Sequence, residues 1–154
     1  MLTLMSRAML FAAVFILALS ARVPATAATG CSSHADSLFA TASTDYQHGK
    51  YVYTSADMQE AATDYYACAQ HAKKAGDPAK YVQYEYFYGE SLYVAGEAEA
   101  KLHHNAKVEE LWSTSLDALK PLQKSQYLDA AERGLASHSV KVMGPTVKLL
   151  SQEQ

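Results

Sequence analysis

Basic residues are in the minority in this sequence, with 13 Lys and Arg against 16 Asp and Glu. The Lys and Arg residues do not form a cluster along the chain. A nucleic-acid-binding protein needs clustered positive charge to neutralise phosphates. A protein held on anionic lipid by its own surface needs a basic amphipathic helix. We therefore expect no nucleic-acid partner and no electrostatic membrane surface.

Long hydrophobic runs are also scarce, and the one that stands out is short. It covers Ala8–Leu19, 12 residues without a polar side chain, whereas a membrane-spanning helix needs about 20. Such a run, followed by the small-residue pattern Ala25-Thr26-Ala27, is typical of a removable signal peptide. We predict a signal peptide over residues 1–27, cleavage after Ala27 and a periplasmic or secreted protein, with a retained membrane anchor as the alternative.

Cysteine is rare too, with only Cys31 and Cys68 in the chain. In an exported domain, such a pair favours a disulfide, and closing this loop would stabilise the fold by about 4 kcal/mol. The segment Ala28-Thr29-Gly30-Cys31 also resembles a bacterial lipoprotein box, which would put a lipid on Cys31 and thereby anchor the protein to a membrane. The disulfide is the favoured prediction; the alternatives are a lipidated Cys31 with Cys68 buried in the core, or two free thiols.

Motifs of catalysis and cofactor binding are missing. The sequence contains no C-x-x-C-H, H-E-x-x-H or G-x-S-x-G motif and no phosphate-binding glycine loop. Its six histidines include two pairs at helical spacing with another possible ligand, Cys68 with His71 and Glu99 with His103. Surface histidines explain these pairs better, so we predict no catalytic residues, no metal and no cofactor.

What the sequence does contain is helical periodicity, which predicts an all-α fold. The expected architecture is a set of antiparallel helical hairpins, stacked as a short solenoid or bundle of about five to six helices. An N-terminal extension over 28–35 would precede a helical repeat-like domain over 36–150. The expected helices cover 35–46, a segment from Thr54 to Gly76, 77–96, part of 97–120 and 122–138.

Particular residues mark the expected helix ends. Gly49, Gly76 and Gly96 are predicted to end the first three helices, and Asp77-Pro78 is a strong signal for the start of the third. Gly144-Pro145 is predicted to break the chain before a short terminal segment that ends at Leu150.

An internal repeat is visible at a separation of about 46 residues, as when Tyr46-x-x-Gly49 recurs as Tyr93-x-x-Gly96. Over residues 36–121 the chain resembles the tetratricopeptide-repeat family. The resemblance rests on the segment Tyr46–Tyr51 and on the small, aromatic, small spacing of Ala62, Tyr66 and Ala69. It implies stacked helical hairpins with a binding groove.

Tyrosine is abundant, with 11 residues in the chain, and tyrosine is enriched where protein surfaces bind partners. The repeat alignment places Gln83, Tyr86, Glu90 and Tyr93 on the groove side of the third helix and leaves Tyr88 in the core. The sequence thus predicts a non-catalytic helical-repeat protein that binds an unknown protein or peptide along this side.

The alternative prediction is a periplasmic helical bundle that binds a ligand or metal. Its site residues would be Cys68, His71 or His103.

Overall fold

A computed structural model describes residues 30–152 of the chain; the predicted signal peptide, its cleavage site and the first residues of the predicted extension lie outside this range. Within it the fold is all-α, as predicted, with five α-helices and one short 3-10 helix. The elements are α2 (Ser33–Gln47), α3 (Tyr51–Lys74), α4 (Pro78–Lys101), α5 (Asn105–Leu119), η1 (Lys120–Lys124) and α6 (Ala130–Leu150).

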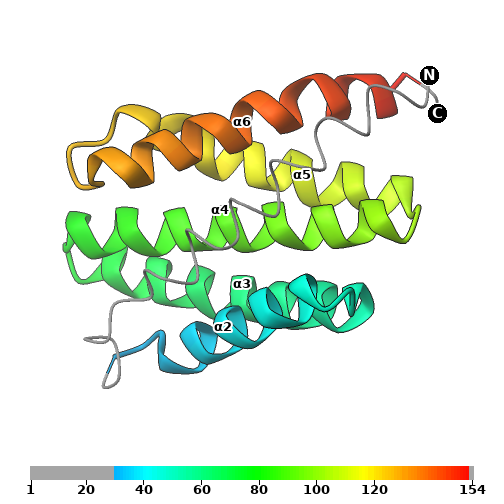
Figure 1. The fold of residues 1–154 in the computed structure, drawn as a ribbon. Coiled ribbons are helices and arrows are strands. Elements are labelled where there is room, and N and C mark those ends of the chain that lie inside the picture. The colour runs from blue at the N-terminus through cyan, green and yellow to red at the C-terminus, as the bar shows by residue number, and fades with distance from the viewer. Residues whose placement is uncertain (1–29, 153–154) are drawn as a thin grey trace.

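The helices lie side by side, and each packs mainly against its neighbours in sequence, so that α4 occupies the middle of the stack (Figure 1). Direct contacts also join alternate helices. The Phe39 ring on α2 meets Phe87 on α4 with 6.3 Å between ring centroids, and Ser139 on α6 donates to Glu90 on α4. Helices α2, α4 and α6 thus form one layer, with α3 and α5 in the other.

Several predicted helix boundaries are confirmed by the local geometry. Gly49 and Gly76 have φ values of 74° and 70°, the left-handed conformation that follows a helix C-terminus and favours glycine. The Asp77 side chain accepts a hydrogen bond from the Lys80 backbone N–H at 3.0 Å, which caps α4 as expected.

The predicted end at Gly96 is wrong, because α4 continues to Lys101. Gly96 has no side chain at a point where α5 approaches closely, and its role is in packing. The turn after α4 uses His103 instead, which has a φ of 61°. Histidine is among the non-glycine residues found more often in this conformation.

Two other predicted boundaries are wrong. Helix α3 begins at Tyr51 because Gly49 already turns the chain, and the Thr54 hydroxyl donates back to the Lys50 carbonyl at 3.2 Å inside the first turn. The break at Gly144-Pro145 does not occur, since α6 runs to Leu150 with Pro145 inside it. Pro145 and Lys141 are both exposed, so water can bond the Lys141 carbonyl that lacks a helical donor.

The predicted fifth helix over 122–138 is also shifted. The segment Lys120–Lys124, which includes Pro121, forms η1, and α6 starts only at Ala130. A capping box defines this start: the Asp129 carboxylate accepts from the Glu132 N–H at 2.8 Å, and Glu132 accepts from the Asp129 N–H at 2.8 Å.

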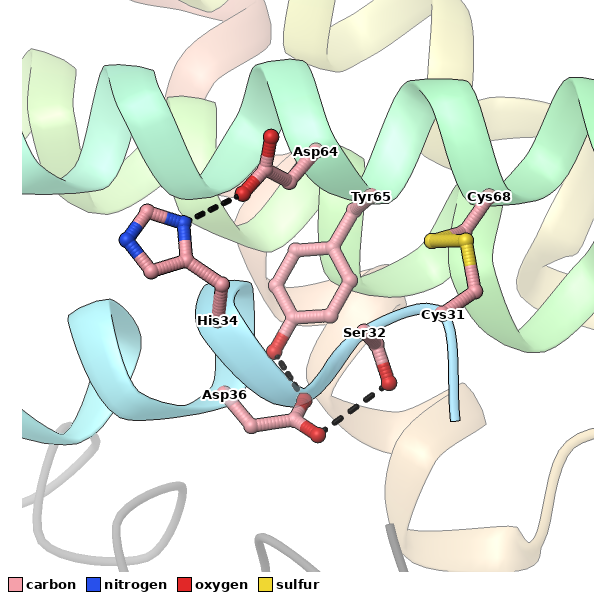
Figure 2. The surroundings of a disulfide bond; sticks show 7 residues. All are labelled: Cys31, Ser32, His34, Asp36, Asp64, Tyr65 and Cys68. Carbon is pink, nitrogen blue, oxygen red and sulfur yellow. Dashed lines mark hydrogen bonds and ion pairs between the residues drawn. A yellow bond between two sulfur atoms is a disulfide. The ribbon is translucent and has the colours of Figure 1, made fainter. Parts of the chain in front are cut away.

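The disulfide predicted from the two cysteines is present, with the sulfur atoms of Cys31 and Cys68 2.05 Å apart (Figure 2). It ties the chain before α2 to the C-terminal third of α3. A Cys31 in this disulfide has no free thiol that could carry the lipid of the alternative prediction. None of the helices within residues 30–152 has the length and hydrophobicity that a membrane span requires.

Polar contacts reinforce the same junction (Figure 2). The Tyr65 hydroxyl donates to Asp36 at 2.6 Å, and the Ser32 hydroxyl donates to the other Asp36 oxygen at 3.1 Å. His34 pairs with Asp64 at 2.7 Å, and this hydrogen bond raises the pKa of His34. The start of α2 is therefore held on α3 by a covalent bond and by two side-chain contacts, Tyr65–Asp36 and His34–Asp64.

Candidate functional site

The predicted binding residues of α4 do not form an exposed surface. Of the four, only Gln83 is exposed, while Tyr86 and Tyr93 are each 2% exposed and Glu90 is 0% exposed. The predicted exposure was wrong, because the side of α4 that carries Tyr86 and Tyr93 packs against other helices. Tyr93 stacks on Trp112 of α5 with 6.0 Å between ring centroids, and Glu90 meets α6.

Glu90 is a fully buried acid between α4 and α6. The Ser139 hydroxyl lies 3.2 Å and 3.1 Å from its two carboxylate oxygens. Burial raises the pKa of Glu90 to about 8, against the smaller opposing effect of this hydrogen bond. Glu90 is therefore protonated at neutral pH and belongs to the core.

A partly buried carboxylate, that of Glu97, lies on the same side of α4, between α2 and α4. Tyr46 donates to Glu97 at 3.5 Å, and the Tyr93 hydroxyl also bonds this carboxylate. Burial raises the pKa of Glu97, while the tyrosine hydroxyls and Lys101 lower it. The two tyrosines satisfy a carboxylate that would otherwise be costly to bury.

The opposite side of α4 is open, because α3 and α5 flank it there without closing over it. They leave a pocket of about 320 Å³, which we call the α3–α5 pocket. Its lining residues come from α3, α4 and α5: Gln59, Ala62, Thr63, Tyr66, Tyr88, Leu92, Glu110, Leu111 and Thr114.

An aromatic pair marks the surface of this pocket. Tyr66 on α3 is 47% exposed, and its ring lies 5.2 Å from that of Tyr88 on α4, centroid to centroid. Tyr88, expected in the core, is only half-buried, whereas Leu92 beneath it is buried. Apolar Leu92 and Leu111 with a rim of polar side chains give the pocket the character of a protein interaction site.

A polar chain lies around the end of α4 beyond this pocket. The Ser55 hydroxyl on α3 donates to Glu99 on α4, and the other Glu99 oxygen pairs with His104 Nδ1 at 2.6 Å. Gln59 of the pocket donates to the Ser55 hydroxyl oxygen at 2.9 Å. A catalytic serine needs a histidine between it and the acid; here the acid lies between serine and histidine, so the arrangement fastens the α4–α5 turn to α3.

At the other end, the partly buried stripe of α4 that carries Tyr88 includes one charged residue, Glu85. Tyr81, Glu85, Tyr88 and Leu92 recur at helical spacing on one face. The Tyr81 hydroxyl is within hydrogen-bonding reach of Glu85, and the Lys73 ammonium lies 5.6 Å from the centre of the Tyr81 ring. Burial raises the pKa of Glu85, and the nearby Lys73 charge and the Tyr81 hydrogen bond lower it.

The alternative metal site is not assembled by the described residues. Cys68 is in the disulfide, and Glu99 pairs with His104 rather than with His103. His71 lines a separate hollow of about 430 Å³ beside the disulfide, with Asp77 and Lys80 among its other residues. Within residues 30–152 no three His, Cys, Asp or Glu side chains come together as a metal would require.

Sequence reasoning missed Tyr66 as a surface residue and placed the buried residues Tyr86, Glu90 and Tyr93 on the open side of α4. One signal could have corrected it. Glu85 lies within the stripe that was expected to be core, which a charged residue argues against.

No family model matches this chain, and neither a curated protein nor a solved structure matches it significantly. The functional interpretation therefore rests on the geometry just described.

Proposed function

We propose that this protein is exported to the periplasm or the cell exterior, where it acts as a non-catalytic helical-repeat protein that binds a peptide segment of a partner protein. The binding site in this proposal is the α3–α5 pocket, on the side of α4 opposite to the one that the sequence suggested.

The observation that carries the binding proposal is the Tyr66–Tyr88 pair over buried Leu92. A tyrosine that is 47% exposed yet packed against a second ring has little side-chain entropy left to lose on binding. The polar rim of Gln59, Thr63 and Thr114 can hydrogen-bond a peptide backbone, and the apolar floor can accept a side chain.

Two features support export. The apolar run before Ala25-Thr26-Ala27 has the length of the apolar core of a signal peptide. The Cys31–Cys68 disulfide fits an oxidising compartment, because cytosolic proteins rarely keep such bonds. Intact mass of the protein recovered from the periplasm or medium tests this part: a chain beginning at Ala28 is expected, and a full-length or lipid-modified chain would contradict it.

Peptide selection tests the binding part. A displayed library of random peptides is selected on the exported protein, and enriched peptides are measured against two variants. Tyr66→Ala should weaken binding about tenfold or more, as for a central aromatic contact. Tyr127→Ala is the matched control, since Tyr127 is also exposed but lies in the η1–α6 connection. Absence of enriched peptides, or equal binding to Tyr66→Ala, would refute the pocket.

A further inference from the structure

The charged end of the partly buried α4 stripe combines aromatic rings with a carboxylate. Four residues, which we call the Glu85 cluster, make it up: Lys73 from α3, and Tyr81, Glu85 and Tyr88 from α4. Glu85 is near enough to both tyrosines to interact electrostatically with their hydroxyls. Tyr66 interacts with the same two tyrosines, so the cluster continues directly into the α3–α5 pocket.

This combination is suited to a cation. The faces of tyrosine rings attract ammonium and guanidinium groups, and a carboxylate beside them adds charge attraction. Glu85 is only partly exposed, so its charge is screened less than that of a fully exposed acid.

The protein's own Lys73 already demonstrates this preference. Its ammonium lies over the Tyr81 ring at 5.6 Å and within electrostatic reach of Glu85. Lys73 is exposed on the last turn of α3 and pairs with no carboxylate within 4.0 Å among the described residues. A flexible lysine held only by these contacts can be displaced at little cost, because its ammonium is readily hydrated outside the cluster.

We propose that the Glu85 cluster binds an arginine or lysine side chain of the partner peptide, which displaces Lys73 while a neighbouring apolar residue of the peptide enters the α3–α5 pocket. The proposal rests on the proposed function and specifies the chemistry of its partner. The charge balance of the chain agrees with a basic partner, since the whole sequence has a net charge of −3.

The test uses two small probes of the same shape that differ in charge, N-acetyl-arginine methylamide and its citrulline counterpart. Ring signals of Tyr81 and Tyr88 in the exported protein are followed by NMR during titration. The arginine probe should shift them saturably, and the citrulline probe should need at least about tenfold more for the same shift. Equal responses to the two probes, or no saturable response to arginine, would overturn the proposal.

Variants separate the roles within the cluster. Glu85→Gln should remove the preference for arginine over citrulline. Lys73→Met should strengthen arginine binding several-fold, because the resident cation is gone, and Lys74→Met, at the adjacent exposed lysine, should leave it unchanged. A preference that survives Glu85→Gln, or an arginine affinity that Lys73→Met does not raise, would overturn the proposal.

The peptides enriched in the library selection distinguish failure of the cation site from failure of the proposed function. If they bind in a Tyr66-dependent way but show no preference for arginine or lysine, the pocket stands and the cation site is refuted. If no peptide depends on Tyr66, the proposed function is refuted as well.

Discussion

Gly96 on α4 lies beneath the indole of Trp112 on α5, so closely that a Cβ atom at position 96 would be 2.2 Å from the indole Nε1. The indole is fixed in this position, because its N–H donates to the Tyr93 carbonyl at 3.0 Å and its ring stacks on Tyr93. Gly89, one heptad earlier, gives the same close approach to Leu119, with a Cβ distance of 2.6 Å. The contact between α4 and α5 therefore depends on two missing side chains.

Gly96→Ala should destabilise the protein by about 1–3 kcal/mol, the usual cost of overpacking, because Trp112 can move only by losing its hydrogen bond. Urea denaturation followed by circular dichroism measures this. Gly134→Ala on α6 is the matched control: a Cβ there would meet nothing within 4 Å, so alanine should stabilise α6 by about 0.5–1 kcal/mol through its helix propensity. Equal effects of the two substitutions would refute the packing role of Gly96.

These glycines also explain how far the sequence could predict the fold. Periodicity and end signals gave the all-α class and the turns at Gly49 and Gly76, since a left-handed glycine after a helix leaves a local pattern. Gly96 is also a glycine, but it lies inside α4 and allows close packing against α5. Only the position of Trp112, sixteen residues further along the chain, distinguishes a packing glycine from a helix end.

The candidate site was less predictable for a similar reason. A helix with tyrosines on two sides does not reveal which side its neighbours cover, and the repeat alignment assigned Tyr86 and Tyr93 to the open side. Three-dimensional packing decides this, through the Trp112 ring over Tyr93 and through Ser139 beside Glu90. The disulfide was predictable because the chain contains only two cysteines.

The disulfide should make a large contribution to stability. Reduction, or replacement of both Cys31 and Cys68 by Ser, should lower the free energy of unfolding by about 4 kcal/mol in the chain-entropy model. Denaturation with and without reductant measures this, and the double serine variant should not respond to reductant. Alkylation of unreduced, denatured protein should label neither cysteine; two labelled thiols would show that the bond is absent.

Glu90 should make stability depend on pH. Its pKa is about 8 in the folded protein, against the ordinary value of 4.5 expected after unfolding. Between these values the folded state holds a proton that the unfolded state has released, so stability should fall as pH rises from about 4.5 to 8, by up to about 1.4 kcal/mol per pH unit. Burial also raises the pKa of Glu97, which acts in the same direction.

Glu90→Gln should therefore flatten this pH dependence and stabilise the protein at pH 8 relative to the wild type, while changing little at pH 4. Urea denaturation at pH 4, 6 and 8 provides the comparison. Glu110→Gln is the control, since the Glu110 side chain is 64% exposed and its substitution should change stability by less than about 0.5 kcal/mol. An unaltered pH slope in Glu90→Gln would show that Glu90 ionises normally in the folded protein.

Tyr93 on α4 and Tyr66 on α3 should differ sharply in their contribution to folding. Tyr93→Ala should cost about 3–5 kcal/mol, because it empties a buried space beside Trp112 and removes a hydroxyl that bonds the partly buried Glu97. Tyr66→Ala should cost about 1 kcal/mol or less, because nearly half of that side chain already faces solvent. Chemical denaturation of the two variants measures the difference. Similar losses would mean that Tyr66 is a structural residue like Tyr93, and the α3–α5 pocket would then lose the aromatic residue on which its binding role depends.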